Sequence, residues 1–274
     1  MQQNKPFPRV LTIAGSDSGG GAGIQADLKT FGALGAYGAS VVTAVTAQNT
    51  LGVQGVHAVP ADMVAAQCES VLGDIRMDAV KIGMLPDVAT IETVAQALRK
   101  YPVPFMVLDP VLVATSGDSL ALENTVDAIC GQLLPLADVV TPNLNELAQL
   151  SGNAPAQDEA EMLAQGQQLL QKGAKAVLLK GGHWADSAQA RDWLVQRNSE
   201  PQCFVNSRIA TANTHGTGCT LASAIAALYP HRRNLNFAVA AAKSYLHGAI
   251  AAGQYWKVGS GHGPLAHFWR TVRD

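Results

Sequence analysis

Short apolar runs that alternate with helical patterns constrain the fold of this chain more than any other feature. Each run is rich in valine, isoleucine or leucine, as is typical of strands buried on both faces of a parallel sheet. Between the runs, residues 63–72 and 159–171 carry apolar side chains at helical spacing. This order predicts an α/β fold, a three-layer αβα sandwich around a mostly parallel central sheet. The runs are residues 10–14, 79–83, 105–109, 138–141 and 176–180.

One pair of segments departs from this order. Residues 191–195 and 203–209 flank the turn-forming sequence 198–201 (NSEP), which favours an antiparallel pair near the edge of the sheet. No stretch rich in proline, serine or charge divides the chain, and it contains no internal repeat. Its length leaves the number of domains open, but the unbroken pattern predicts a single domain over residues 1–274.

Composition excludes several classes of partner. The formal charge of −2 gives no general attraction to nucleic acid or to an anionic membrane. No apolar stretch approaches membrane-spanning length, and the polar N-terminus lacks the apolar core of a signal peptide. The four cysteines lack the spacing of a zinc site or of a disulfide framework. We therefore expect a cytoplasmic protein with free thiols that acts on a small molecule.

Polar residues or glycines follow each predicted parallel strand. In a parallel sheet these carboxyl ends lie along one edge, and open α/β sheets bind ligands in the crevice outside that edge. Turns are polar in most proteins, so the pattern favours one shared site without establishing it. The segments are Gly15-Ser16-Asp17, Gly83-Met84, Asp109-Pro110, residues 141–143 and residues 180–183.

A glycine-containing segment, residues 213–220 (NTHGTGCT), leads into an alanine-rich sequence with strong helix propensity. Gly216 and Gly218 allow backbone N–H groups at the helix N-terminus to face outward, where they can hold a phosphoryl group. An ordinary helix start is the alternative. Cys219 falls in the first turn, where unpaired N–H groups lower the pKa of a thiol. It is then either a proton acceptor for a substrate hydroxyl or a structural thiol.

Candidate oxygen ligands for a magnesium ion follow two of the predicted strands. Asn143 and Glu146 lie three residues apart in the sequence 141–146 (TPNLNE), and Asp109 ends a buried strand. One carboxylate together with nucleotide phosphates can hold Mg²⁺. Taken without the other segments, the first pair is explained better by a helix cap with a solvated acid. Lys180 either neutralises a phosphate or lies on the surface. For Lys243, on a predicted C-terminal helix, the sequence favours a surface position.

The glycine-rich segment 19–23 opens a helix after the first strand and partly fits a dinucleotide-binding fingerprint. No acidic residue occurs between Asp27 and Asp62, so the carboxylate that would hold a ribose is missing. A phosphate-binding Gly-Lys-Ser/Thr loop is also absent. This glycine segment is therefore expected to approach an uncharged or aromatic substrate.

These motifs together resemble bacterial hydroxymethylpyrimidine/phosphomethylpyrimidine kinases, the thiamine-pathway branch of the ribokinase-like superfamily. The resemblance covers nearly the whole chain in order. It implies two successive phosphorylations with ATP and Mg²⁺, and a homodimer. The segments that carry it are Ala14-Gly15-Ser16-Asp17, the glycine-rich stretch with Gln25-Ala26-Asp27, residues 141–146, residues 180–183 and residues 213–219.

The resemblance also implies roles for individual residues. For the substrate it implies Gln48 as the reader of the aminopyrimidine edge, with Asp27, Met84 and Gly15 as further pocket residues. For the phosphates and nucleotide it implies an anion hole at Gly216 and Gly218, Mg²⁺ ligands at Asn143 and Glu146, Cys219 in place of an aspartate base, and nucleotide contacts at Lys180 and Lys243. Beside these we expect Asp109 to organise the metal and Thr214 to contact the nucleotide.

Three other activities compete with this interpretation. Pyridoxine or pyridoxal kinases share the fold and chemistry, and only the pyrimidine kinase adds a second phosphate. A pyrimidine-binding protein without turnover would bind the ring but consume no ATP. A nicotinamide oxidoreductase is disfavoured by the missing ribose carboxylate.

Overall fold

The computed structural model describes residues 7–112, 124–182 and 188–271. Its described part contains one nine-stranded sheet with the order β3-β2-β1-β4-β5-β6-β7-β8-β9. The six strands from β2 to β7 in this order are parallel, whereas β3, β8 and β9 are antiparallel to their neighbours. The strands are β1 (Arg9–Asp17), β2 (Tyr37–Asn49), β3 (Gly52–Ala58), β4 (Ala79–Ile82), β5 (Met106–Leu108), β6 (Val139–Val140), β7 (Ala176–Lys180), β8 (Gln189–Gln196) and β9 (Gln202–Ser207).

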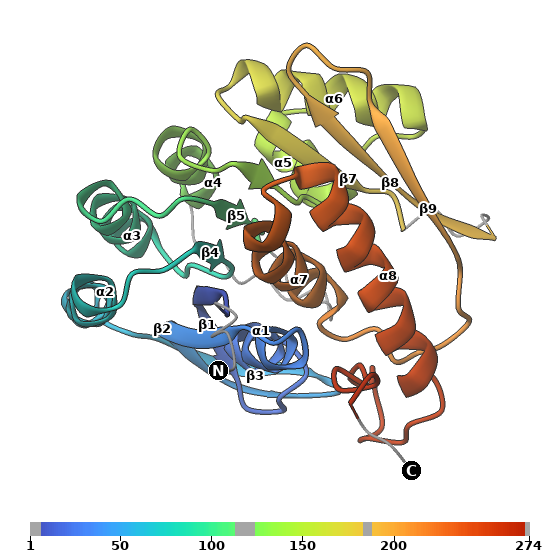
Figure 1. Cartoon of the computed structure of the whole chain (residues 1–274), viewed down its shortest axis with the longest axis horizontal. Helices are drawn as coiled ribbons and strands as arrows, with labels where there is room; N and C mark the ends of the chain where they lie inside the picture. The colour runs from blue at the N-terminus through green and yellow to red at the C-terminus, as the bar shows by residue number, and fades with distance from the viewer. Residues whose placement is uncertain (1–6, 113–123, 183–187, 272–274) are drawn as a thin grey trace, which may run out of the picture.

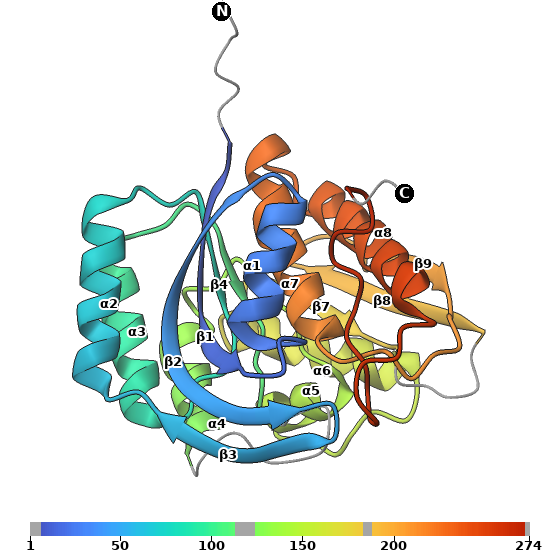
Figure 2. The same ribbon diagram turned by 90° about the horizontal axis from the view of Figure 1, so that it is seen from below.

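Helices cover both faces of this sheet, as Figures 1 and 2 show. One face packs against α1 (Gly23–Ala33), α7 (Thr217–Arg232) and α8 (Leu235–Gly253). The other face packs against α2 (Ala61–Asp74), α3 (Val88–Lys100), α4 (Thr125–Ala128) with the π-helical turn η1 (Ile129–Leu133), α5 (Leu144–Ser151) and α6 (Glu159–Gln171). This arrangement is the predicted three-layer αβα sandwich.

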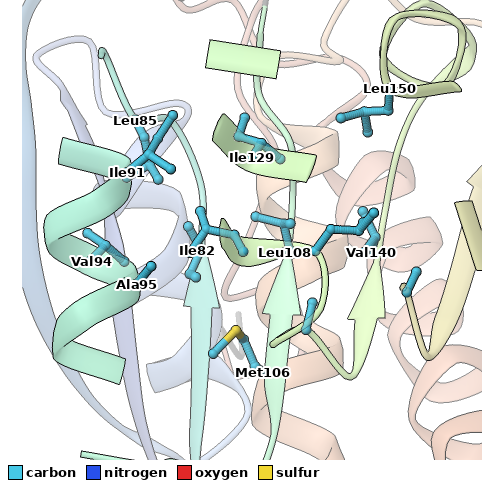
Figure 3. Close-up of a cluster of buried hydrophobic side chains, with 14 of the residues drawn as sticks. Ile82, Leu85, Ile91, Val94, Ala95, Met106, Leu108, Ile129, Val140 and Leu150 are labelled. Atoms are coloured by element: carbon cyan, nitrogen blue, oxygen red, sulfur yellow. The ribbon is translucent and has the colours of Figure 1, made fainter. Parts of the chain in front are cut away.

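Successive residues of the central strands point to opposite faces and fill two separate cores. On β5, Met106 and Leu108 lie in the core beneath α3 and α6, whereas Val107 lies in the core beneath α7 and α8. Figure 3 shows the first core, where Ile82 and Leu108 lie on neighbouring strands beside Ile91 of α3. Burial on both faces explains why these strands read as continuous apolar runs.

All five predicted parallel strands are confirmed, as are the helix at residues 159–171 and the antiparallel pair β8 and β9 at one edge. The strands β2 and β3 at the other edge were not predicted. Only some β2 residues are buried, and β3 contains two glycines and is mostly exposed, so neither shows a buried apolar run. Among the described residues, no helix has the length and apolar character needed to cross a membrane.

Candidate active site

The carboxyl ends of the parallel strands line one cavity of about 670 Å³. Each of the five strand-end segments singled out in the sequence contributes at least one lining residue, so their predicted convergence is confirmed. His183, at the end of the last segment, lies outside the described residues. The contributions are Gly15, Ser16 and Asp17 from β1, Met84 after β4, Asp109 after β5, Asn143 after β6, and Lys180 and Gly182 from β7 and its end.

Residues 214–219, at the N-terminus of α7, also line this cavity. Gly216 caps the helix with a left-handed φ of 81°, and a Cβ atom there would lie 1.9 Å from the carbonyl oxygen of Gly21. Thr217 and Thr220 donate their backbone N–H groups to carbonyls within the segment. Within the described part of the chain, the N–H groups of Gly218 and Cys219 therefore remain available for an anion. The predicted glycine-rich helix start is confirmed.

A cluster of opposite charges faces Gly218. Nζ of Lys180 lies 3.0 Å from Oδ1 of Asp109 and 3.6 Å from Oε2 of Glu146. A Cβ atom on Gly218 would lie 3.4 Å from Nζ of Lys180. Burial acts to raise the pKa of Asp109, but Lys180, Lys81 and two side-chain hydrogen bonds outweigh it and lower this pKa below its ordinary value. Asp109 is therefore an ionised carboxylate beside the helix N-terminus.

Glu146 behaves differently from Asp109. Burial raises its pKa to about 7, an effect that Lys180 opposes and the nearby Asp109 reinforces. Its Oε2 atom accepts the backbone N–H of Asn143 at 2.8 Å, while Oδ1 of Asn143 accepts the N–H groups of Asn145 and Glu146. These bonds form a reciprocal capping box at the start of α5. The cap interpretation of this pair is correct, although its acid is buried and not solvated.

The donor atoms in this cluster fit a magnesium ion held chiefly through phosphates. Oδ2 of Asp109 and Oε1 of Glu146 have no hydrogen-bond partner among the described residues. The oxygen of Asn143 instead accepts two backbone hydrogen bonds, which leaves it poorly suited to the ligand role expected from the resemblance. No group of three or more acidic, histidine or cysteine residues forms a complete metal site in the described chain. Two carboxylates suffice when nucleotide phosphates supply the remaining oxygens.

Cys219 lines the cavity, but its environment contradicts the expected low pKa. Withdrawal from water raises the pKa of the thiol to about 11, and the nearby carboxylates of Asp27 and Asp109 add to this effect. Lys81 and the backbone N–H of Gly23 act in the opposite direction without compensating. The helix N-terminus alone suggests a thiolate, whereas the whole environment keeps a neutral thiol near pH 7.

Asp27 does not line the cavity, contrary to the role that the resemblance implied for it. Its buried carboxylate accepts two hydrogen bonds from Nζ of Lys81 at 3.0 Å and one each from Thr12 and Ser223 at 2.6 Å. The side chain of Lys81 is itself fully buried and does reach the cavity wall. Asp27 thus holds Lys81 in position from behind the site, and its oxygens are fully used.

The lysine at position 243 is buried, so the simpler surface interpretation is wrong. Its Nζ atom lies 2.6 Å from Oδ2 of Asp192 on β8, and both residues line the cavity. Oδ1 of Asp192 accepts the N–H of Gly181, which connects this pair to the end of β7. Thr214 also lines the cavity near the start of α7.

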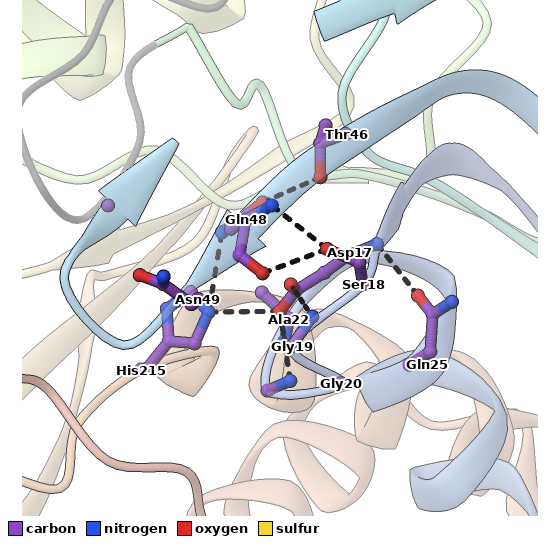
Figure 4. Close-up of polar contacts among 12 residues, drawn as sticks. Asp17, Ser18, Gly19, Gly20, Ala22, Gln25, Thr46, Gln48, Asn49 and His215 are labelled. Atoms are coloured by element: carbon purple, nitrogen blue, oxygen red, sulfur yellow. Dashed lines mark hydrogen bonds and ion pairs between the residues drawn. The ribbon is translucent and has the colours of Figure 1, made fainter. Parts of the chain in front are cut away.

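The three other residues implied for substrate binding do line the cavity. Gly15, Gln48 and Met84 all line it, from β1, β2 and the end of β4. A Cβ atom on Gly15 would lie 2.8 Å from the sulfur of Met84, so glycine keeps this wall open. Figure 4 shows Gln48 beside Asp17 and His215.

The family model described as phosphomethylpyrimidine kinase matches residues 17–266 of this chain. The hydroxymethylpyrimidine/phosphomethylpyrimidine kinase of Salmonella typhimurium is 52% identical over 259 residues, which cover 94% of this chain and 97% of that protein. This chain belongs to the phosphomethylpyrimidine kinase family. The resemblance inferred from the motifs is thereby confirmed.

Solved structures agree with membership in the phosphomethylpyrimidine kinase family. The phosphomethylpyrimidine kinase of Clostridium difficile has 40% identity and a TM-score of 0.78, and covers 89% of this chain and 99% of that chain. The pyridoxal kinase of Staphylococcus aureus in complex with ADP has 34% identity and a TM-score of 0.89, and covers 97% and 95%. These likenesses confirm the ribokinase-like fold.

Sequence reasoning missed two features of this family member's site, the lysine at position 81 and the pair of Asp17 and His215. Lys81 interrupts an otherwise apolar strand, and a charge within a buried strand signals a buried partner. Nε2 of His215 lies 3.0 Å from Oδ2 of Asp17, 198 residues away. No local pattern marks a contact between segments so distant in sequence.

Proposed function

We propose that this protein is an ATP-dependent kinase that phosphorylates 4-amino-5-hydroxymethyl-2-methylpyrimidine and then its monophosphate, for thiamine biosynthesis. The supporting observation is one cavity whose lining residues come from distant parts of the sheet order, with residues 214–219 at the N-terminus of α7 among them. We call the part lined from β2, β1 and β4 the acceptor arm, and the part lined from β8, β9 and α8 the donor arm. On one side lie Gly15, Gln48 and Met84, and on the other lie Asp192 and Lys243. A phosphate donor and an acceptor can approach the same helix end from opposite sides.

The sheet order explains this separation. The acceptor arm lies at β2, β1 and β4, and the donor arm lies at β8, β9 and α8, with β5, β6 and β7 between them. Lys180 ends β7, Asp109 directly follows β5, and Glu146 lies in the first turn of α5, the helix that follows β6. The charged cluster therefore lies where the transferred phosphoryl group must pass.

In the proposed reaction, the N–H groups of Gly218 and Cys219 hold the transferred phosphoryl group, and Lys180 neutralises its charge. Phosphoryl transfer depends mainly on such positioning and charge stabilisation. Asp109 and Glu146 would hold Mg²⁺ through their free oxygens. The ion would supply charge neutralisation on the nucleotide phosphates.

The two steps make different demands on a proton acceptor. The first acceptor is a hydroxyl group, whereas the second is a phosphate that is largely deprotonated at neutral pH, with a second pKa of about 6. The raised pKa of Cys219 makes a thiolate scarce in the free enzyme. We therefore assign Cys219 to the positioning of the acceptor in both steps rather than to proton abstraction.

Gln48, with Gly15 and Met84 beside it, is proposed to read the pyrimidine. Its side-chain amide can accept from the exocyclic amino group and donate to the neighbouring ring nitrogen. Lys243 and Thr214 are proposed to contact the nucleotide. The family resemblance also leads us to propose a cytoplasmic homodimer with one domain per chain. Sedimentation of the purified protein would test whether it is a dimer.

Pyridoxal kinase activity is the second candidate, because the Staphylococcus aureus pyridoxal kinase shares the fold. The deciding experiment incubates the purified protein with Mg-ATP and either hydroxymethylpyrimidine or pyridoxal, and identifies the products by mass. We expect the pyrimidine to gain two phosphoryl groups in succession. A product with a single phosphoryl group, formed faster from pyridoxal than from the pyrimidine, would favour the second candidate.

A further inference from the structure

The side-chain amide of Gln48 lies between two polar neighbours on the cavity wall (Figure 4). Its oxygen Oε1 lies 3.1 Å from Oγ1 of Thr46, and its nitrogen Nε2 lies 3.4 Å from Nε2 of His215. The hydroxyl of Ser18 meanwhile accepts the N–H of Gln48 at 2.9 Å and donates to its carbonyl oxygen at 2.8 Å. The backbone of Gln48 is therefore fixed, and only the orientation of its amide is open.

Thr46 has one hydroxyl hydrogen, and two acceptors compete for it. Oγ1 of Thr46 lies 2.8 Å from the carbonyl oxygen of Ser16, which can only accept. When Thr46 donates its hydrogen in the shorter bond, to Ser16, only the lone pairs of its oxygen face the amide of Gln48. The amide nitrogen of Gln48, and not its oxygen, is then the matching partner.

His215 makes the same demand from the other side. Its Nε2 atom lies 3.0 Å from Oδ2 of Asp17, and this oxygen also accepts the backbone N–H groups of Gly21 and Ala22. Burial acts to raise the pKa of Asp17, but the hydrogen bonds from His215 and the backbone lower it below its ordinary value. Nε2 of His215 must therefore carry a hydrogen to reach this carboxylate. A ring nitrogen that carries a hydrogen has no lone pair to accept an N–H from Gln48, so the amide oxygen is the compatible neighbour.

A half-turn of the amide about its last side-chain bond exchanges its oxygen and nitrogen, and satisfies both neighbours at once. We propose that Thr46 and the His215–Asp17 pair lock the Gln48 amide with its nitrogen toward Thr46 and its oxygen toward His215. They are thereby specificity-determining positioning residues. This amide lock leaves one N–H and one oxygen lone pair of Gln48 for a ligand.

The lock fixes which ring edge the site accepts, an inference that rests on the proposed role of Gln48. The exocyclic amino group of the pyrimidine donates to the oxygen on the His215 side, and the ring nitrogen accepts from the N–H on the Thr46 side. A ring in which a carbonyl replaces the amino group presents the opposite pattern of donor and acceptor. A locked amide rejects this oxo ring, whereas a free amide rotates by half a turn and accepts it.

The experiment compares kcat/KM for the amino and oxo forms of the hydroxymethyl pyrimidine. The Thr46→Val variant nearly preserves shape but removes the oxygen that holds the amide nitrogen. We expect the preference of the wild-type enzyme for the amino ring to fall about tenfold in this variant, the order of effect of one hydrogen bond. The matched control, Thr46→Ser, keeps the hydroxyl and the preference, and the KM for ATP is unchanged in both.

A purely structural role for Thr46 would lower kcat/KM for both rings by the same factor, and this unchanged ratio would overturn the lock. NMR of the wild-type protein tests the lock without any variant, should Thr46→Val fold poorly. We expect nuclear Overhauser contacts from the side-chain NH₂ of Gln48 to the Thr46 methyl group, whereas contacts to the His215 ring in their place would contradict the lock. Wild-type enzyme that phosphorylates neither ring would instead refute the proposed function, and the NMR result would still decide the orientation.

Discussion

Nζ of Lys180 lies 3.0 Å from Oδ1 of Asp109 on the wall of the cavity. The carboxylate is almost fully buried, and the lysine side chain is 13% exposed. In addition, Nζ of Lys180 lies 3.6 Å from Oε2 of Glu146, so one ammonium group is paired with two carboxylates. Its charge keeps the two carboxylates together, and we propose that it also neutralises the transferred phosphoryl group beside Gly218.

Replacing this lysine tests both roles. Lys180→Met should lower kcat/KM for ATP roughly 100-fold, the scale of losing one preorganised charged donor. It should also reduce the free energy of unfolding by about 3 kcal/mol, because a buried carboxylate loses its partner. Steady-state kinetics and urea denaturation measure the two effects. The control Lys180→Arg keeps the charge and should lose less stability, and equal losses in both variants would argue against the charge as the cause.

Glu146 predicts a pH-dependent contribution to stability. Its pKa is about 7 when folded and has its ordinary value of 4.5 when unfolded, so the folded state binds more protons between these values. The stability contributed by Glu146 therefore falls as the pH rises from 4.5 to 7. Glu146→Gln should gain stability relative to wild type between about pH 5 and pH 8, by up to roughly 3 kcal/mol. Thermal unfolding at a series of pH values measures this difference, and a constant difference would contradict the buried acid.

The same carboxyl group predicts the pH dependence of the reaction. An ionised Glu146 is the form that can hold a metal-bound nucleotide, so kcat/KM for Mg-ATP should rise with pH on a limb centred near 7. The limb should disappear in Glu146→Gln, which keeps the size of the side chain. A limb of unchanged position in that variant would assign it to another group.

The thiol of Cys219 should be unreactive at neutral pH. With a pKa of about 11, its alkylation by iodoacetamide should accelerate as the pH rises toward 11 in the folded, ligand-free protein. Mass analysis of the peptide that contains Cys219 follows the modification. Rapid alkylation at pH 7 would indicate a thiolate and restore the role of proton acceptor.

Kinetics of Cys219→Ala separate the two roles further. A positioning residue should affect both phosphorylation steps by comparable factors, whereas a proton acceptor should matter chiefly for the hydroxyl in the first step. We expect comparable losses when each step is measured with its own substrate. A selective loss of the first step would count against the positioning role.

Asp27 should act on stability rather than on substrate binding. Asp27→Ala leaves the ammonium group of Lys81 buried without a partner, and should lower the free energy of unfolding by about 3–5 kcal/mol. The matched control Ser223→Ala removes only one hydrogen bond to this carboxylate and should lose about 1 kcal/mol. Urea denaturation measures both. A rise in the KM for the pyrimidine at unchanged stability would place Asp27 in the substrate pocket after all.

The central strands and the strand-end site could be predicted because burial on both faces leaves a continuous apolar signal. The edge strands β2 and β3 could not, since β3 is held mainly by its pairing with β2 and exposes most of its residues. No local pattern therefore marks Gln48, near the end of β2, as a residue of the site. Its correct placement in the cavity came from the family resemblance.

The pKa values and contacts of the site residues were harder to predict than which residues line the cavity. The position of Cys219 in the first turn of α7 indicates a low pKa, but Asp27 and Asp109 come from distant segments and, with burial, reverse the direction. Likewise, the spacing of Asn143 and Glu146 fits both a helix cap and a metal site, and the structure shows that the cap is formed. The metal role of Asn143 stays a prediction.

We propose that one site, at the N-terminus of α7, performs both phosphoryl transfers. The most direct test is a time course of products by mass, with hydroxymethylpyrimidine and excess Mg-ATP, for wild type and for Gly218→Val. A Cβ atom at Gly218 points toward Lys180 and Asp109, so a valine should fill the space for the phosphoryl group. We predict that the wild-type monophosphate rises and then falls as the diphosphate appears, and that the variant loses both products. Continued conversion of supplied monophosphate to diphosphate by Gly218→Val would contradict the claim.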